Sequence, residues 1–138
     1  MELHQMIQEA LRSGKWMLRR SNEGKSVSSD AKGFQWQPVG EWTEAPDWDP
    51  APRCGGGLHG NGPLSKGYWE GGGNIDFCVV DGDMVDIDDA EKVKVRRAMI
   101  VLRDTLPGGL SVGGFLDLEG TQITALPDGL SVGGRILR

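Results

Sequence analysis

Apolar residues near the N-terminus recur at the spacing of an amphipathic helix. They stand at positions i, i+3, i+4, i+7 and i+8, which places them on one side of a helix. These residues are Leu3, Met6, Ile7, Ala10 and Leu11. Gly14 follows as a stop signal. The pattern predicts a helix over residues 2–13 whose apolar side packs on the rest of the protein.

Further along the chain, alternating apolar positions and short apolar runs predict strands. The segments with this pattern are 15–20, 33–42, 74–80, 84–87 and 92–102. Pro38 places the second strand at a sheet edge or ends it. Gly82 and Asp83 predict a turn between 74–80 and 84–87. The predicted fold class is α+β, with the N-terminal helix packed on a small, mostly antiparallel sheet.

The C-terminal third contains a repeat. Residues 106–125 read LPGGLSVGGFLDLEGTQITA, and residues 126–138 restart as LPDGLSVGGRILR at an offset of 20 positions. This unit resembles the short bacterial leucine-rich repeat, with Thr121 where asparagine is usual. About one and a half units cannot bury a solenoid core, since about three are needed. We therefore expect residues 106–138 to stack on an α+β domain formed by residues 1–105, continuing the sheet from strand 92–102.

Composition narrows the classes of function. Hydrophobic residues make up 38% of the chain and charged residues 25%, which is ordinary for a globular protein. The net charge of −5 argues against direct nucleic-acid or membrane-surface binding. No apolar run approaches the roughly 20 residues of a membrane span, and polar residues interrupt the N-terminus where a signal peptide would be apolar. We expect a cytoplasmic protein whose Cys54 and Cys78 are reduced thiols.

An acidic run is the main charge feature. Its candidate partner-binding residues are Asp81, Asp83, Asp86, Asp88, Asp89 and Glu91. Such a run is most often a solvated face, but spaced carboxylates can also occupy the basic surface of another protein. The sequence therefore suggests a protein partner with a basic surface, and it leaves homo-oligomerisation open.

Glycine is enriched to 22 residues, against a usual share of about 7%. Part of this excess lies in a glycine-rich loop at residues 54–73. Its Gly55, Gly56 and Gly57, together with His59 and Arg20, form an alternative ligand site in which backbone N–H groups would cradle a phosphate. The expected Lys-Ser/Thr pair and following helix are missing from this sequence, so a sharp turn is the competing interpretation.

The same loop also contains side chains that could bind a metal or act as a nucleophile. Cys54, His59 and Cys78, with Asp47 or Asp49, have the side chains that zinc binds. The Cys-x4-His spacing is unusual for a metal site, and Cys78 lies in an apolar run where a free cysteine packs as a small hydrophobic residue. We therefore predict no metal, no cofactor and no cysteine nucleophile.

Residues 14–102 resemble a family of uncharacterised phage and bacterial proteins. The matching stretches are 33–36 (GFQW), 45–50 (APDWDP), 54–60 (CGGGLHG) and 92–95 (KVKV). The resemblance implies an origin in a phage or mobile element. The resulting hypothesis is a non-enzymatic interaction protein that inhibits a bacterial defence system, as anti-CRISPR proteins do. A more distant likeness to an ADP-ribosyltransferase-type scaffold gives the alternatives of an enzyme or a nucleotide binder using the glycine-rich loop; a structural or assembly role is a third hypothesis.

Overall fold

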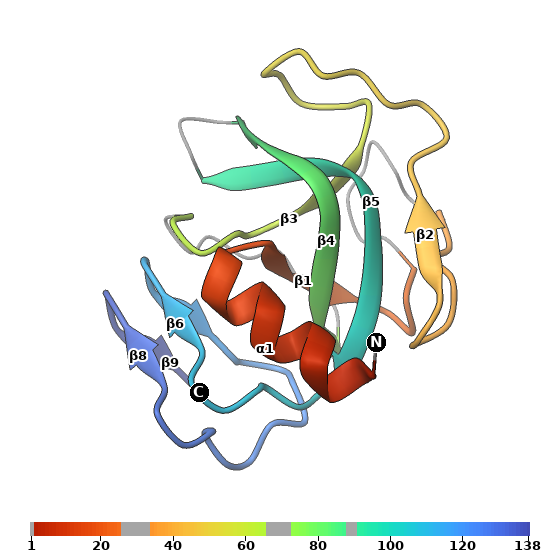
Figure 1. Ribbon diagram of the computed structural model, residues 1–138. Helices are drawn as coiled ribbons and strands as arrows, with labels where there is room; N and C mark the ends of the chain where they lie inside the picture. Colours follow the sequence, from red (N-terminus) through yellow and green to blue (C-terminus); the bar gives the residue numbers. More distant parts are fainter. Residues whose placement is uncertain (1, 26–33, 66–72, 88–90) are drawn as a thin grey trace.

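The computed structural model describes residues 2–25, 34–65, 73–87 and 91–138. These residues form one short N-terminal helix and mostly antiparallel strands, so the predicted α+β class is confirmed (Figure 1). The elements are α1 (Leu3–Ser13), β1 (Trp16–Ser21), β2 (Trp42–Glu44), β3 (Leu58–Gly60), β4 (Asn74–Ile87), β5 (Lys92–Arg103), β6 (Ser111–Val112), β7 (Leu116–Asp117), β8 (Ser131–Val132) and β9 (Ile136–Leu137).

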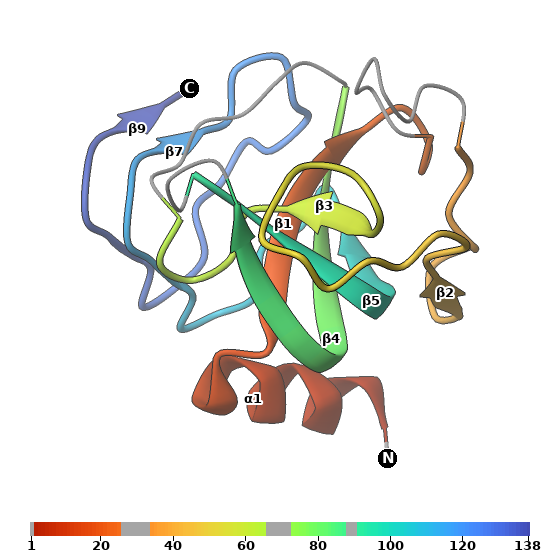
Figure 2. The same cartoon turned by 90° about the horizontal axis from the view of Figure 1, so that it is seen from above.

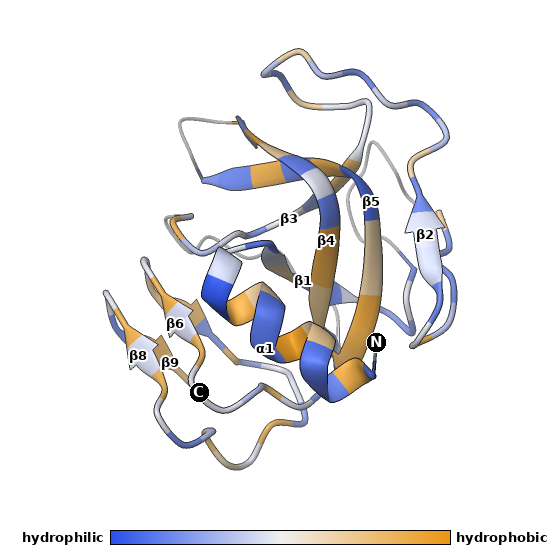
Figure 3. Ribbon diagram, viewed as in Figure 1, coloured by the Kyte–Doolittle hydropathy of each residue, from blue (hydrophilic) through white to orange (hydrophobic). Residues whose placement is uncertain are grey.

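Helix α1 ends at Ser13, as the sequence predicts, and begins at Leu3, one residue after the predicted start. The backbone N–H of Glu2 donates to the side chain of Gln5, and the two residues form a capping box. Gly14 ends the helix with a left-handed φ of 78° and donates its N–H to the carbonyl of Ala10. Apolar and polar residues alternate around the helix in Figure 3, and Ala10 is its fully buried residue.

The main sheet curls until it closes on itself. Strand β5 pairs with β4 along its length, with β3 through Val95 and with β2 through Met99. Leu18 of β1 and Asn61, just after β3, exchange two backbone hydrogen bonds of 2.8 Å. The circuit β1–β4–β5–β3 is therefore joined back to β1, and β4 and β5 are strongly curved in Figure 2.

Closure gives the sheet an interior and an exterior, each with its own core. Alternate residues of β1 point to opposite sides, so Met17 faces inward while Trp16 and Leu18 face outward. The interior core consists of Met17, Trp36, Leu58, Cys78, Val80, Val93, Val95, Ala98 and Ile100. The exterior core lies beneath α1 and the C-terminal segment, and there the rings of Trp16 and Phe77 stack at 5.7 Å.

The C-terminal segment forms two parallel strand pairs, β6 with β8 and β7 with β9. Each residue pairs with the residue 20 positions later, as Ser111 does with Ser131. Leu110 and Leu116 are completely buried in the exterior core, beside Trp16 and Phe77. The segment thus packs on the outer face of the sheet, as its shortage of repeats requires.

Three sequence predictions are wrong in detail. The C-terminal strands do not continue the sheet from β5, because they pair with each other in two separate two-stranded sheets and pack their leucines on the outer face of the main sheet. Within 34–42, Gln35 makes only an isolated bridge, and strand pairing starts at Trp42, because Pro38 and Gly40 form a turn. Segments 74–80 and 84–87 belong to one strand, since the predicted turn is a bulge in which Gly82 has a φ of 99°.

We predict that Gly133→Ala will destabilise the protein by about 1–3 kcal/mol, the usual cost of overpacking. A Cβ atom at position 133, in the second repeat unit, would overlap the carbonyl oxygen of Gly113 in the first repeat unit. Gly108→Ala is the matched control, because its Cβ would meet nothing closer than 3.6 Å, the carbonyl of Asp128. The measurement is urea unfolding of both variants. Equal unfolding midpoints would contradict the close stacking of the two repeat units.

Candidate functional site

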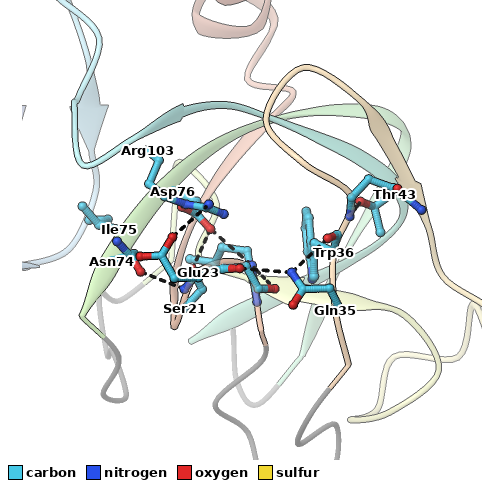
Figure 4. A network of polar contacts seen from close by, with 12 residues as sticks. Ser21, Glu23, Gln35, Trp36, Thr43, Asn74, Ile75, Asp76 and Arg103 are labelled. Atoms are coloured by element: carbon cyan, nitrogen blue, oxygen red, sulfur yellow. Dashed lines mark hydrogen bonds and ion pairs between the residues drawn. The ribbon is translucent and has the colours of Figure 1, made fainter.

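A buried carboxylate, that of Asp76, lies on the inner face of the sheet between β1 and β4. The Asp76 side chain is 0% exposed and accepts hydrogen bonds from Ser21 (2.9 Å), Arg19 (3.3 Å) and Arg103 (2.8 Å) (Figure 4). Arg19 also lies over the ring of Trp36 at 4.2 Å. Because each oxygen of Asp76 is hydrogen-bonded, this cluster is satisfied within the protein and serves the fold.

The two arginines of this cluster differ in environment. Burial lowers the pKa of Arg19, although the carboxylate of Asp76 opposes that change. The hydrogen bond to Asp76 raises the pKa of Arg103, whose guanidinium is partly exposed. Arginine stays protonated in either setting, so both guanidinium groups keep their positive charge at all ordinary pH values.

A groove lies between α1 and the bulge of β4, with a volume of about 420 Å³. Met6, Ala10, Trp42 and Val79 give it an apolar floor. The bulge forms one wall, because the strand departs from regular pairing between Asp81 and Met84. The groove exists because α1 covers only part of the sheet's outer face.

Carboxylates line the rim of this groove. They belong to Glu9, Asp81 and Asp83, while Lys15 donates to the carbonyl of Gly82 at 2.9 Å. Asp81 forms an ion pair with Arg97 at 2.8 Å, and Glu9 forms one with Arg12. Asp83 is exposed and has no ion pair among the residues that the structure describes, so its charge is available to a ligand.

Arg97 connects the rim to the neighbouring strand. Its guanidinium binds Asp81, lies 3.3 Å from Glu44 and stacks over the ring of Trp42 at 4.2 Å. This arrangement fixes one face of Trp42 and leaves the acidic rim only partly neutralised. The groove therefore combines an apolar floor with a rim of three carboxylates and the ammonium group of Lys15.

The structure separates the predicted acidic residues. Asp81 and Asp83 lie at the groove, whereas Asp86 is exposed farther along β4. Glu91 is half-buried, and its backbone carbonyl accepts a hydrogen bond from Asn61 at 2.7 Å. Asp88 and Asp89 lie outside the described residues.

The glycine-rich loop is held by a contact within it and by contacts with Asp49 and Lys94. The N–H of Gly55 donates to Nε2 of His59 at 3.3 Å, and its carbonyl accepts from Nζ of Lys94 at 2.9 Å. The carbonyl of Gly56 accepts from the N–H of Asp49 at 2.8 Å. Of the three glycine N–H groups that would cradle a phosphate, that of Gly55 is thus already bonded to His59.

Arg20 takes part in a different contact. Its guanidinium donates to the carbonyls of Asp117 (3.3 Å) and Glu119 (2.8 Å), tying β1 to the C-terminal segment. Burial lowers its pKa, and nearby Asp117 and Asp104 oppose that shift. Among the described residues, the hydrogen bonds found for Arg20 do not join it to the glycine-rich loop.

The two cysteines lie in different environments. Cys54 is exposed in the loop, whereas Cys78 is buried in the interior core and burial raises the pKa of its thiol. No group of three potential metal ligands gathers anywhere in residues 2–25, 34–65, 73–87 or 91–138.

Sequence reasoning found Asp81 and Asp83 by their charge but missed the groove itself. Met6 and Trp42 come from distant parts of the chain, so only tertiary structure joins them. The local sequence feature that relates to the groove is Gly82, because a glycine readily adopts the positive φ that the bulge in β4 requires.

Comparison of the chain with protein-family models, curated proteins and solved structures gives no match. The described residues contain no helix long and apolar enough to cross a membrane. The site must therefore be interpreted from its own geometry.

We predict that Asp76→Asn will lower the free energy of unfolding by about 3–5 kcal/mol, since it leaves buried Arg19 without its counter-charge. Asp81→Asn is the control, because the Asp81 side chain is 59% exposed and such pairs contribute no more than about 1 kcal/mol. Both values come from urea unfolding monitored by circular dichroism. Similar losses in the two variants would show that the Asp76 network does not hold the sheet.

We predict that one of the two thiols will react with a disulfide reagent in the native protein at pH 8. Cys54 is exposed, whereas Cys78 is inaccessible and its raised pKa keeps it protonated. Cys54→Ser should therefore be unreactive until denaturant is added. Rapid reaction of native Cys54→Ser would contradict the burial of Cys78.

Proposed function

We propose that this protein is a non-enzymatic interaction module that binds a basic protein partner through the groove between α1 and β4. The observation that carries the proposal is the apolar floor of the groove beneath a rim that includes Asp83, whose carboxylate has no ion pair with any residue that the structure describes. Lysine and arginine side chains combine an aliphatic stem with a charged head. Either would place its stem against Met6 and Trp42 and its head beside Asp83.

Arginine fits this site better than lysine. Its guanidinium forms paired hydrogen bonds with a carboxylate, and Asp83 and Asp81 lie on the same rim. Met6 supplies a flexible, polarisable surface that adapts to the shape of the incoming side chain. The remaining exposed charge on β4, at Asp86, would attract the basic partner before it docks.

We further infer that residues 106–138 are a short leucine-rich-type repeat. The support is the pairing of residues 20 positions apart and the burial of Leu110, Leu116 and Leu118 at alternating positions of the unit. Repeats of this type commonly present surfaces for binding other proteins. An interaction role therefore fits both parts of the chain.

Our biological hypothesis is a phage-encoded inhibitor of a bacterial defence system, similar in action to an anti-CRISPR protein and active in the host cytosol. It rests on the sequence resemblance of residues 14–102, on the small size of the chain and on its net charge of −5. An acidic inhibitor would compete with nucleic-acid phosphates for the basic surface of its target.

The alternative is an ADP-ribosyltransferase-like enzyme or nucleotide binder that uses Arg20, His59 and the glycines at 55–57. The geometry favours it less, because Gly55 already bonds His59 and Lys94. Arg20 is also engaged with the carbonyls of the C-terminal segment. Enzymes of that type use a catalytic glutamate, for which Glu91 and Glu70 would be the candidates in this chain; Glu70 lies outside the described residues.

We predict that Asp83→Asn will weaken the binding of an arginine-alanine repeat peptide at least tenfold, which corresponds to about 1.4 kcal/mol. Asp128→Asn makes the same charge change at an exposed site in the C-terminal segment and should have less than a twofold effect. Isothermal titration calorimetry gives both affinities. Binding of the wild type should also weaken as salt rises from 50 to about 300 mM, because exposed charges are then screened.

Nuclear magnetic resonance locates the peptide in the same experiment. Amide shifts should concentrate at Gly82, Asp83 and the C-terminal half of α1, which line the groove. Equal loss of affinity in Asp83→Asn and Asp128→Asn would mean that the peptide responds only to net charge. That result, or shifts confined to another surface, would overturn the proposal.

A further inference from the structure

Strand β4 has a strand neighbour on both sides over its first half but on one side over its second half. It pairs with β5 almost throughout, whereas it pairs with β1 from Asn74 to Val79. The last bond on the β1 side joins the N–H of Val80 to the carbonyl of Lys15, at 3.0 Å. Just before Lys15, the chain turns at Gly14 into α1. The second half of β4 therefore runs past β1, with β5 as its one strand neighbour in the described part of the chain (Figure 1).

The hydrogen bonds of β5 identify which backbone groups lie on this unpaired side of β4. The carbonyl of Arg96 accepts from the N–H of Ala45 at 2.8 Å, so the backbone groups of Arg96 point away from β4. In an antiparallel ladder these groups alternate in direction along each strand. Val95 therefore points toward β4 and bonds with Met84, its partner in the register. The next residue of β4, Val85, then directs its N–H and C=O groups away from β5.

The open edge of β4 comprises the N–H and C=O groups of Val85 and Ile87, which point to the same side. They have no hydrogen-bond partner within residues 2–25, 34–65, 73–87 and 91–138. The edge adjoins the groove, because Gly82 and Asp83 line the groove and come just before Val85 in the strand. An extended chain that leaves the groove can thus continue along the open edge.

We propose that an extended basic segment of the partner adds to β4 at this open edge as a further strand. The inference rests on the basic partner proposed for the groove and names the way in which that partner binds. An uncovered strand edge is a template for another strand, and main-chain hydrogen bonds then supply affinity.

Charge decides which strand fits the edge. Asp83 and Asp86 are exposed on either side of Val85 along the strand, and neither forms an ion pair with a residue that the structure describes. Lysine or arginine side chains opposite these carboxylates would stabilise the paired strand. A second copy of the chain would instead place an acidic strand against Asp86, and like charges opposite each other are destabilising. The carboxylates therefore favour a basic segment and oppose self-pairing.

The first test is amide hydrogen exchange, measured by nuclear magnetic resonance with a peptide of about eight residues in which arginine and threonine alternate. In the free protein, the N–H of Val85 should exchange faster than those of Met84 and Asp86, which are bonded to β5. Saturation with the peptide should slow exchange at Val85 at least tenfold and leave Met84 and Asp86 nearly unchanged. Attraction between charges alone would not produce this alternation.

Two results of the exchange experiment would overturn the inference. One is an unchanged rate at Val85 in the protein saturated with peptide. The other is a rate at Val85 that falls as the protein concentration rises without peptide, because a second copy would then occupy the edge.

The second test removes the donors of the peptide. The same peptide N-methylated at every residue keeps its charges but lacks the backbone N–H groups that a strand donates. It should bind at least tenfold more weakly in isothermal titration calorimetry. Equal affinities of the two peptides would reject strand addition, and binding of neither would reject both strand addition and the groove proposal.

The two proposals can fail separately. If Asp83→Asn and Asp128→Asn weaken binding equally while the exchange alternation at Val85 persists, the groove proposal fails and the edge remains the binding site. If Asp83→Asn weakens binding selectively but N-methylation has no effect, the groove stands and strand addition fails.

A matched pair of substitutions at one position completes the test. Val85→Pro removes an N–H of the open edge and no bond to β5. Val85→Ala shortens the same side chain but keeps the N–H. We expect the proline variant to bind the unmethylated peptide at least tenfold more weakly than the alanine variant, and both to have circular dichroism spectra like that of the wild type. Equal affinities of the two folded variants would contradict pairing through the edge. If the proline variant does not fold, hydrogen exchange and the N-methylated peptide still decide the question.

Discussion

Burial of β1 and the first half of β4 on both faces is the constraint from which the rest of the architecture follows. Every residue of β1 and every residue from Asn74 to Val80 is buried. A sheet that is apolar on both faces must be covered on both. The inner face is covered because the sheet closes through β5 and β3 around Trp36. The outer face is covered by α1 and the C-terminal segment together, and the space between α1 and β4 that remains is the groove.

The same double burial explains why an ion network lies inside the sheet. Arg19 and Asp76 are opposite each other in the β1–β4 register and point to the same side. Neither charge could be buried alone, since an unpaired buried ion is costly. Arg103, Ser21 and the ring of Trp36 complete their surroundings. The network thereby fixes the register of the two strands, because a slip of one residue would move Asp76 to the apolar outer face.

Local pattern predicted the longer elements of this fold, but neither its shortest strands nor its closure. Periodicity identified α1, and apolar runs identified β1, the start of β4 and β5. Strand β3 was hidden in the glycine-rich loop because its three residues are too short to show alternation. The charges of Asp81 and Asp83 were visible in the sequence. Their position above an apolar floor was not, since it depends on the bulge at Gly82 and on contacts with Met6 and Trp42 from distant segments.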